Sequence, residues 1–499
     1  MKDPKLRQFQ EISALLNSSL HPTEIRTRAI EAATLLMEAE AGSLLLLDEA
    51  VGELYFEVAH GEKGAAVREI RLKLGEGIAG HVAQTGEGVI VNDVQRDSRF
   101  FRSADRQSGF TTRNMVCAPV MVHGKVIGVL QAINRKGGGL FDEDDLQNCV
   151  ALGHQVSIAI ENARLYDEIQ HLFEGFISAS VQAIESRDPT TSGHSNRVAL
   201  LTCRLAEAVT RTDSGPYGAS RFDEGQMKEI RYAALLHDFG KVGVREHILV
   251  KARKLYPGEL ALVKARFDFI KRTLENQMLR QKIAILQRKK RTGTARLLSD
   301  LNREFIRRLQ DVDDAFLFIV KCNQPNVTPQ DGFDRLHDIA KRQYESFDGS
   351  CPYLSHDEVI ALSLPAGSLT PDERREIESH VTHTFDFLSK IPWTSSLQSI
   401  PAIAYSHHEK LDGTGYPRKL VASQIPVQSR MMTICDIYDA LTASDRPYKA
   451  AVPASRALGI LEGYAKEGKV DAALLALFID TKVYRATEGT DRTPRTVCA

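Results

Sequence analysis

The chain has 499 residues, more than one hydrophobic core normally holds, so two or three domains are expected. Hydrophobic residues make up 43% of it and charged residues 26%, and these ordinary proportions exclude a disordered or collagen-like protein. Because 64 Lys and Arg balance 65 Asp and Glu, no overall positive field would attract nucleic acid, and no nucleic-acid partner is expected.

The N-terminal segment predicts a short helix and no targeting signal. Residues 4–18 follow a helical pattern without the uninterrupted apolar core of a signal peptide. No apolar run in the chain approaches the roughly 18 residues that a membrane span needs. The seven cysteines are scattered without CxxC spacing, which is typical of a reducing compartment. We therefore expect a cytoplasmic protein without a membrane span.

Residues 21–165 alternate helical stretches with short strands. Strands are predicted at 43–48 and 53–61, with a polar turn between them, and two more within 115–135 meet at His123-Gly124. A helix follows this second pair. The pattern favours an α+β domain with a five- or six-stranded antiparallel sheet and helices to one side of it.

Four motifs in this region together resemble a GAF domain. They are GEGIAG, VNDVQRDSRF, GKVIGVLQAINR and AIENARLYDEIQ, which occupy residues 75–80, 91–100, 124–135 and 159–170. The resemblance implies a sensor that responds to a small molecule or acts by pairing subunits. The sequence does not identify the ligand of this GAF domain.

Some cyclic-nucleotide-binding GAF domains carry a signature of Asn-Lys, Phe and Asp-Glu. This chain has Asn134, Arg135, Phe141 and Asp145, but Leu146 stands where the Glu would fall. The departure argues against a cyclic nucleotide as the GAF ligand. A domain that binds no ligand and only pairs subunits is the alternative.

A long helix is predicted from about residue 142 to residue 187, and its stretch 166–182 is the expected linker helix between sensor and effector. Four apolar residues follow 4-3-4 spacing and share one stripe of this helix: Leu165, Ile169, Leu172 and Phe176. We expect a parallel homodimer through this stripe. The alternative is a helix that packs on its own domain.

Histidine is concentrated in the second half of the chain, where nine of the fifteen histidines lie at or after His194. The apolar helix of 231–244 ends in His237-Asp238, a pair that can ligate metal ions at a buried helix end, although chance often supplies it. His407 and His408 are consecutive. Neighbours on a helix point about 100° apart, so these two suit different metal ions, or else mark a partly exposed helix end.

Asp436 and Asp439 are three residues apart and share one helix face. Two negative charges there repel each other unless a positive group lies nearby. A metal ion, Arg446 or Lys449 would each provide the compensating charge.

Five ordered blocks resemble the HD-GYP domain, a subgroup of the HD phosphohydrolases. They are GHSNRV, HDFGK, LTPDERREIESHV, HHEKLDGTGYP and DIYDAL followed by DRPYK, and they start at residues 193, 237, 369, 407 and 436. The resemblance implies an all-helical domain with a metal centre, usually of iron or manganese, that hydrolyses the bacterial second messenger cyclic di-GMP to pGpG and GMP. The metal ligands it implies are His194, His237, Asp238, His380, His407, His408 and Asp436.

The number of metal ions is predicted from what precedes the first of these histidines. Some relatives with three metals carry a glutamate just before it. Here Thr190 and Thr191 occupy that stretch, with Glu185 and Asp188 further back. We therefore expect two divalent ions, with three as the alternative, and Asp238 bridging them.

The resemblance also implies roles in catalysis and substrate binding. Asp238 and Lys241 are the expected catalytic residues, and the Lys241 ammonium would stabilise the scissile phosphate or the leaving oxygen. An exposed lysine at a helix end is the plainer interpretation of Lys241. The expected substrate-binding residues are Gly415, Tyr416, Pro417, Arg446 and Lys449.

Alternatives remain at the level of function. The Gly-Tyr-Pro loop is either a contact for a diguanylate cyclase domain, as the resemblance implies, or a rigid turn after the histidine pair. The substrate is cyclic di-GMP or another cyclic dinucleotide such as 3',3'-cyclic GMP-AMP. A signalling scaffold that binds nucleotide without turnover is the alternative from another class.

An insertion separates the proposed ligands, because His237 and His380 are 143 positions apart. Within it, 267–291 and 294–310 predict a helical hairpin. From Lys264 to Arg308 there are 14 Lys and Arg against 4 Asp and Glu, a net charge of +10. Such a hairpin would contact an acidic partner, a membrane surface or nucleic acid, or is simply a solvated face.

The expected fold is therefore multi-domain. An α+β GAF domain is joined by a long helix to an all-α HD-GYP domain that carries a helical insertion. The expected bounds are 1–20 for the N-terminal helix, 21–165 for GAF, 166–182 for the linker, 183–480 for HD-GYP with the insertion at 263–365, and 481–499 for the tail.

Overall fold

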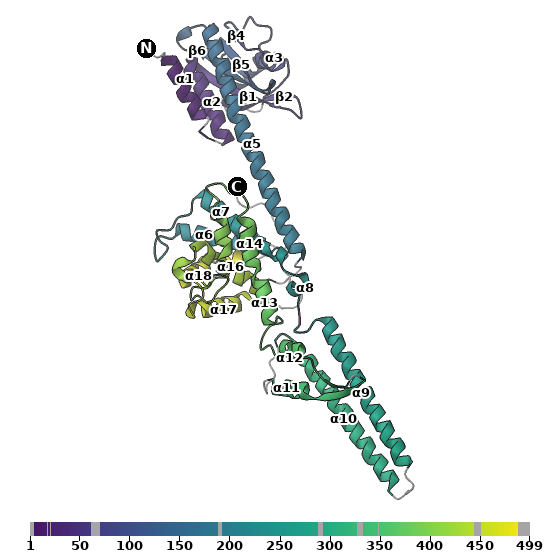
Figure 1. Ribbon diagram of the computed structural model, residues 1–499. Coiled ribbons are helices and arrows are strands. Elements are labelled where there is room, and N and C mark those ends of the chain that lie inside the picture. Colours follow the sequence, from purple (N-terminus) through teal and green to yellow (C-terminus); the bar gives the residue numbers. More distant parts are fainter. Residues whose placement is uncertain are drawn as a thin grey trace. The chain divides into compact units, whose positions relative to one another are not determined.

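The computed structural model describes residues 4–16, 18–19, 21–60, 70–187, 192–287, 293–326, 333–347, 349–443 and 451–487. The chain forms two compact units, residues 1–175 and 176–499, and each is described by itself (Figure 1). The predicted tail beyond residue 487 lies outside the described residues.

The first unit is built on one antiparallel sheet of six strands, in the order β3-β2-β1-β6-β5-β4. The strands are β1 (Ala39–Asp48), β2 (Glu53–His60), β3 (Arg71–Lys73), β4 (Val89–Val91), β5 (Met115–Val122) and β6 (Lys125–Arg135). The β5–β6 hairpin turns at His123 and Gly124, both with positive φ, so the predicted turn is confirmed. The α+β sheet predicted for this region is confirmed as well.

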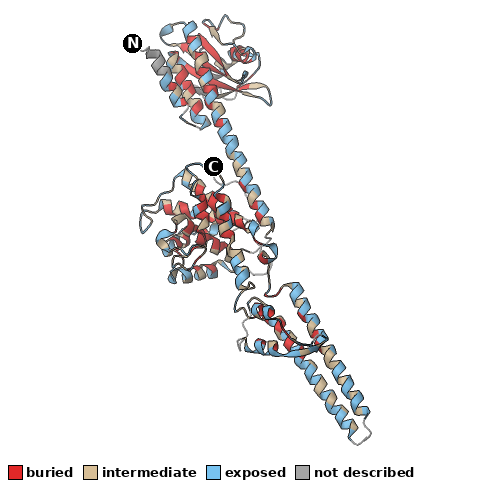
Figure 2. Ribbon diagram, in the orientation of Figure 1, coloured by how far each residue is buried: buried red, intermediate tan, exposed pale blue. Residues whose placement is uncertain are grey.

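Helices cover both faces of this sheet, as Figures 1 and 2 show. They are α1 (Pro4–Leu16), α2 (Pro22–Leu36), α3 (Gly77–Thr85), α4 (Arg102–Ser108), the short η2 (Lys136–Gly138) and α5 (Glu143–Arg187). Along β1 the side chains alternate: Leu44 and Leu46 join a core with α1, α2 and α5, whereas Leu45 joins a second core with α3. The sheet is therefore buried on both sides, and the prediction that helices lie to one side of it is wrong.

The GAF signature positions lie where the sheet meets α5. Asn134 is buried, accepts a hydrogen bond from the Arg113 amide and donates one to the Thr111 carbonyl. Arg135 forms an ion pair with Asp145, which also accepts from the Asp142 amide. These contacts connect the sheet to the start of α5.

The second unit contains a helical bundle. Its helices are α6 (His194–Arg211), α7 (Glu224–Leu236), η4 (Phe239–Gly243), α8 (Glu246–Leu249), α13 (Pro371–Glu378), α14 (His380–Leu388), α15 (Ile400–Tyr405), η5 (Ala422–Gln424), α16 (Val427–Thr442), α17 (Ala454–Lys466), α18 (Ala472–Asp480) and η6 (Val483–Thr487). Helix α6 packs on α7 and α16, and α14 packs on η4 and α15. These contacts bring distant histidines together.

The region between α8 and α13 has a hydrophobic core of its own. It contains α9 (Pro257–Leu286), α10 (Thr294–Cys322), α11 (Asp334–Lys341), the hairpin β7 (Gln343–Ser346) and β8 (Gly349–Pro352), and α12 (His356–Leu362). The predicted helical hairpin is confirmed, but it is longer than predicted, and the β-hairpin was not anticipated. Within the described residues, many of its cations pair locally, such as Lys271 with Asp313 and Arg303 with Asp300.

The chain enters and leaves this inserted region at neighbouring points. The Lys251 ammonium donates to both carboxylate oxygens of Glu373, each at 2.8 Å, and the Tyr256 hydroxyl donates to the same residue at 2.7 Å. Ser368 donates to the Lys251 carbonyl at 2.7 Å. The two ends of the inserted region are therefore tied together.

Among the described helices, none combines the length and the hydrophobicity that a bilayer-crossing segment requires.

Candidate metal centre

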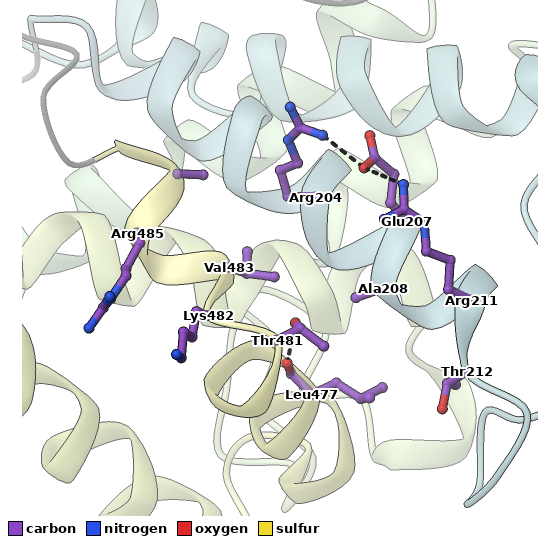
Figure 3. A pocket seen from close by; sticks show the side chains of 11 residues that line it. Arg204, Glu207, Ala208, Arg211, Thr212, Leu477, Thr481, Lys482, Val483 and Arg485 are labelled. Atoms are coloured by element: carbon purple, nitrogen blue, oxygen red, sulfur yellow. Dashed lines mark hydrogen bonds and ion pairs between the residues drawn. The ribbon is translucent and has the colours of Figure 1, made fainter.

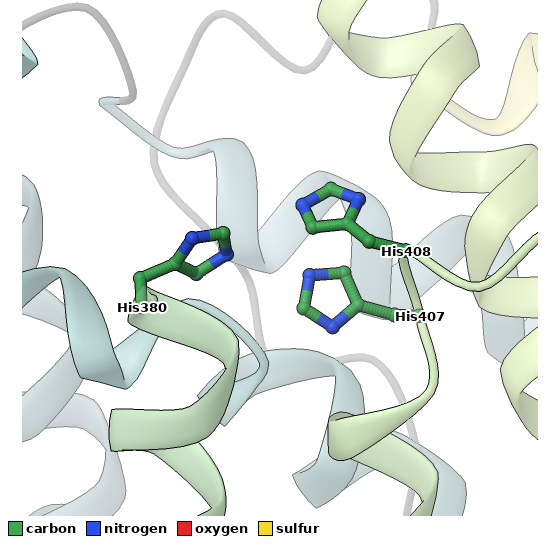
Figure 4. A group of neighbouring side chains, drawn as sticks. All are labelled: His380, His407 and His408. Carbon is green, nitrogen blue, oxygen red and sulfur yellow. The ribbon is translucent and has the colours of Figure 1, made fainter. Parts of the chain in front are cut away.

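Five chain segments bring the seven predicted metal ligands into one cluster. His194 and His380 are the first residues of α6 and α14, His237 and Asp238 follow α7, His407 and His408 follow α15, and Asp436 lies within α16. All except His408 are buried. Two groups have ligand atoms within 4.8 Å of one another: His194, His237 and Asp238, and His380, His407 and His408. In Figure 4 the three rings of the second group face one another.

Helix geometry fixes the orientation of three of these rings. The Nδ1 atoms of His237, His380 and His407 lie 2.6 to 2.7 Å from the carbonyl oxygens of residues 234, 377 and 404, three positions earlier in each case. A carbonyl only accepts, so each Nδ1 carries the proton and each Nε2 keeps its lone pair. Threonine hydroxyls hold two of these backbones, since Thr384 donates to the His237 carbonyl and Thr433 to that of His407.

Asp238 belongs to the first group and also contacts the second. Its Oδ1 is 3.2 Å from His380 Nε2, and its Oδ2 is 3.5 Å from His237 Nε2 and 3.8 Å from His194 Nε2. The Lys241 ammonium lies 2.9 Å from the same Oδ2. The contact between Asp238 and His380 is short but is not a hydrogen bond. His380 Nε2 therefore has no hydrogen-bond partner.

Asp436 spans the groups in a similar way. Its Oδ1 is 3.2 Å from His194 Nε2 and its Oδ2 is 3.8 Å from His408 Nδ1. The two aspartates therefore both touch His194, and each also reaches the second group.

Burial governs the ionisation of the imidazoles. It lowers the pKa of His237 and His407 and brings the pKa of His408 to about 3, because an imidazolium is poorly solvated there. His194 differs: burial opposes its charge, but hydrogen bonds to Asp436 and Asp439 raise its pKa to about 9. His194 is thus held as an imidazolium between carboxylates, and its Nε2 has to lose a proton before it can bind a cation.

The two aspartates stay ionised. Burial alone would raise the pKa of Asp238, but Lys241 and His237 outweigh it and hold that pKa well below the usual range. Burial acts in the same sense on Asp436, where His194 and His408 outweigh it. Ionised carboxylates beside neutral imidazoles are the protonation states that bind divalent cations.

Buried nitrogen atoms without hydrogen-bond partners indicate that the cluster can bind metal ions. His237, His380 and His407 each present a buried Nε2 without a hydrogen-bond partner. An unpartnered buried polar atom is costly, and three such lone pairs beside two carboxylates are stabilised when a cation accepts them. The residues therefore fit divalent metal ions.

Two residues outside the predicted ligand set orient His194. Asp439 Oδ2 lies 2.7 Å from His194 Nδ1, and Arg197 donates to both oxygens of Asp439, at 2.7 and 3.0 Å. The positive charge expected near Asp439 thus comes from Arg197, a source that the sequence analysis missed. Arg197 follows His194 by three residues, so helical spacing could have indicated it.

Removing this support is expected to weaken metal binding. In Asp439→Asn, the carboxylate that holds the His194 ring is lost, so the affinity for Mn²⁺ should fall roughly 10- to 100-fold. Equilibrium titration of the metal-free protein with Mn²⁺ measures this effect. Asp480→Asn, at an exposed position on α18, is the control. Equal affinity in the two variants would contradict an orienting role for Asp439.

The Gly-Tyr-Pro segment lies against the histidine pair. The Tyr416 ring is 4.8 Å from the His408 ring, and burial raises the pKa of the Tyr416 phenol. Buried Glu409 accepts hydrogen bonds from the amides of Arg418 and Leu420, at 2.7 and 2.9 Å. The loop is thereby folded back onto the residue that follows the histidines.

Close packing requires the glycine of this segment. A Cβ on Gly415 would lie 2.3 Å from the Lys410 amide nitrogen and 2.6 Å from Glu409 Cα. The backbone contact is therefore enough to demand glycine at this position. Substrate binding by Gly415, Tyr416 and Pro417 stays a prediction.

The structure separates other candidate residues from the cluster or leaves them undescribed. Arg446, Lys449, Thr190, Thr191 and Asp188 lie outside the described residues. Glu185 accepts from the amides of Gly193 and Ser195, at 2.8 and 3.3 Å, and so caps the start of α6. His383 is exposed on α14 and belongs to neither histidine group.

A pocket of about 570 Å³ lies elsewhere in this unit (Figure 3). Arg204, Glu207 and Arg211 of α6 line it on one side, and residues from Leu477 to Ala486 line the other. Arg204 and Arg211 both pair with Glu207. None of the clustered histidines or aspartates lines this pocket.

Known protein families match residues in both units of the chain. The GAF domain family matches residues 21–160, and families described as HD domain match residues 191–315 and 356–474. The chain carries a GAF domain followed by HD domains. His194, His237 and Asp238 come from the first HD match, and His380, His407, His408 and Asp436 come from the second. The two HD segments thus contribute to one cluster.

Curated relatives match only part of the chain. A probable 3',5'-cyclic phosphodiesterase, pde-5, of Caenorhabditis elegans is 34% identical over 144 residues, or 27% of this chain and 20% of that protein. The 3'3'-cGAMP-specific phosphodiesterase 3 of Vibrio cholerae is 43% identical over 96 residues, or 19% and 20%. The chain thus spans about a fifth of the length of these relatives.

Among solved structures, the GAF domain of an Acinetobacter phosphoenolpyruvate-protein phosphotransferase is 25% identical. The match covers 34% of this chain and 99% of that one, with a TM-score of 0.30.

Proposed function

We propose that the chain is a metal-dependent phosphodiesterase of the HD-GYP subgroup that hydrolyses cyclic di-GMP to pGpG and GMP under control of its GAF domain. The observation that supports this most is the buried cluster that contains three unpartnered imidazole nitrogens and two ionised carboxylates. The HD family matches also support the proposal, because the residues that they cover include all seven members of the cluster.

The seven clustered residues would hold two divalent ions, iron or manganese. His194, His237 and Asp238 form one group and His380, His407 and His408 the other, with Asp436 reaching both. Bound metal ions lower the pKa of water and neutralise phosphoryl oxygens, which is the chemistry that phosphodiester hydrolysis needs. Asp238, which contacts both groups, would bridge the two ions.

Lys241 would act on the substrate from the edge of the cluster. Its side chain is 15% exposed and its ammonium contacts Asp238, so it lies between the buried ligands and solvent. A phosphate oxygen that gains negative charge during bond cleavage would be stabilised by this ammonium. The same contact keeps Asp238 ionised.

Replacing Lys241 is therefore expected to slow catalysis without loss of metal. Lys241→Gln should reduce kcat roughly 100-fold because an aligned donor to the developing charge is lost. Lys241→Arg, which keeps the charge, should recover part of this activity. Metal content measured on the same preparations separates the two roles: loss of metal in Lys241→Gln would show that Lys241 maintains the centre instead.

A second substrate is favoured by one specific observation. The Vibrio cholerae relative, 43% identical over its matched segment, is named as specific for 3'3'-cGAMP. Incubating manganese- or iron-loaded protein with cyclic di-GMP, 3',3'-cyclic GMP-AMP, cyclic GMP and cyclic AMP, followed by product chromatography, distinguishes these substrates. If none is cleaved while a cyclic dinucleotide still binds, the chain is a signalling scaffold and the proposed activity is wrong.

A further inference from the structure

The C-terminal end of α5 belongs to the second unit, which begins at residue 176. Upstream of this point the apolar stripe predicted for α5 is exposed, and Leu172 reaches 75%. Downstream, one face of the helix is buried, because Ile177, Val181 and Ile184 follow 4-3 spacing and are 2, 3 and 4% exposed. The end of α5 is therefore packed into the unit that contains the metal-ligand cluster.

Glu185 caps the first helix of the cluster from outside that helix. The residue before α6 is Gly193, which has no side chain to cap the exposed amides. The Glu185 carboxylate takes this role, since it accepts hydrogen bonds from the Gly193 and Ser195 amides, at 2.8 and 3.3 Å. These two residues flank His194. One side chain of α5 thus fixes the backbone that carries a predicted ligand.

Arg187 contacts the other backbone segment of the first ligand group. Its guanidinium donates to the carbonyls of Val242 and Val244, of which one lies in η4 and the other directly follows η4. Helix η4 begins immediately after Asp238. Residues two apart on a helix point about 200° apart, so Glu185 and Arg187 contact different segments. The end of α5 is thereby bonded to both segments that supply the first group.

We propose that Glu185 and Arg187 are positioning residues through which α5 controls the first ligand group. This group is divided between the two segments that they hold, and His194 Nε2 lies 3.8 Å from Asp238 Oδ2. Rotation of α5, or a shift along its axis, moves these segments by different amounts and changes that distance. Because one metal ion needs both ligands at once, its affinity depends on the position of α5. Control by the GAF domain, which packs on the start of α5, rests on the proposed function.

Titration of the metal-free, full-length protein with Mn²⁺ tests the positioning role. Glu185→Ala should weaken Mn²⁺ binding roughly 10-fold, the effect of losing a residue that supports a ligand. Glu185→Gln, whose amide oxygen still accepts a hydrogen bond, should recover part of this loss. Asp223→Ala is the matched control, because Asp223 accepts from the Gln226 amide at 2.8 Å and caps α7 at the end opposite His237. Equal weakening in Glu185→Ala and Asp223→Ala would indicate a general loss of stability and would overturn the proposal.

Hydrogen exchange tests the connection in the reverse direction. Because coupling between two sites is reciprocal, Mn²⁺ should slow amide exchange severalfold in residues 176–187 of the wild-type protein. In the double variant Glu185→Ala, Arg187→Ala at saturating Mn²⁺, this segment should no longer respond, although peptides that contain His380 should. Unchanged exchange in wild-type protein that has bound Mn²⁺ contradicts the proposal, and so does wild-type protein that binds no Mn²⁺. Neither measurement requires cleavage of cyclic di-GMP, so failure of the proposed activity is recognised separately.

Discussion

His237→Ala is expected to lower the proposed phosphodiesterase turnover by about a thousandfold or more and to reduce the metal content of the purified protein. His237 is 1% exposed, and its Nε2 has no hydrogen-bond partner although it faces Asp238. Removing one ligand of a centre that contributes several kcal/mol to the transition state costs roughly this factor in rate. Steady-state kinetics and elemental analysis of the same preparation measure both effects.

His383→Ala is the matched control for this variant. His383 lies on α14, the same helix as His380, but it is exposed and belongs to neither histidine group. We expect wild-type turnover and metal content. Full activity in His237→Ala, or an equal loss in both variants, would refute the assignment of the cluster as the catalytic centre.

Gly240→Ala is expected to destabilise the second unit by about 3 kcal/mol, at the upper end of what overpacking usually costs. A Cβ at Gly240 would lie 1.9 Å from the His380 carbonyl oxygen and 2.4 Å from the Thr384 amide nitrogen, both backbone atoms. The Gly240 amide also donates to the Thr384 hydroxyl at 2.8 Å. Relief of the clash requires η4 and α14 to separate, and with them His237 and His380.

Chemical denaturation and metal analysis together test this prediction. Gly459→Ala, inside α17 where nothing lies within 4 Å of the added methyl group, is the control. It should be neutral or slightly stabilising, because alanine favours the helix. Wild-type stability in Gly240→Ala would mean that the contact between η4 and α14 is not as tight as the structure shows it.

Much of the fold could be predicted from local sequence patterns. The two apolar segments that meet at the His123-Gly124 turn indicated β5 and β6, and the absence of proline indicated the long α5. The β7–β8 hairpin was not predicted because its strands are four residues long and their sequences, QYES and GSCP, contain too few apolar residues to give a strand signal.

The candidate site could be predicted only in part, for a physical reason. The resemblance of five sequence blocks to the HD-GYP domain pointed to residues that the structure clusters, such as His194 and His380. Partners separated by long stretches of sequence gave no such signal: Asp439 meets Arg197 across 242 residues, and Thr384 meets His237 across 147. Both contacts are products of helix packing, which local spacing does not record.

Because its two ends are held together, the inserted region can change in length and surface charge without changing the rest of the unit. Lys251 and Glu373 clamp the two points where that region begins and ends, and the region has a separate core. The entropy cost of closing a long loop grows only slowly with its length, and here a partly buried ion pair already fixes the closure. The segment between Lys251 and Glu373 can therefore gain residues, lose residues or acquire new surface charge. The distance between His237 and His380 would stay the same.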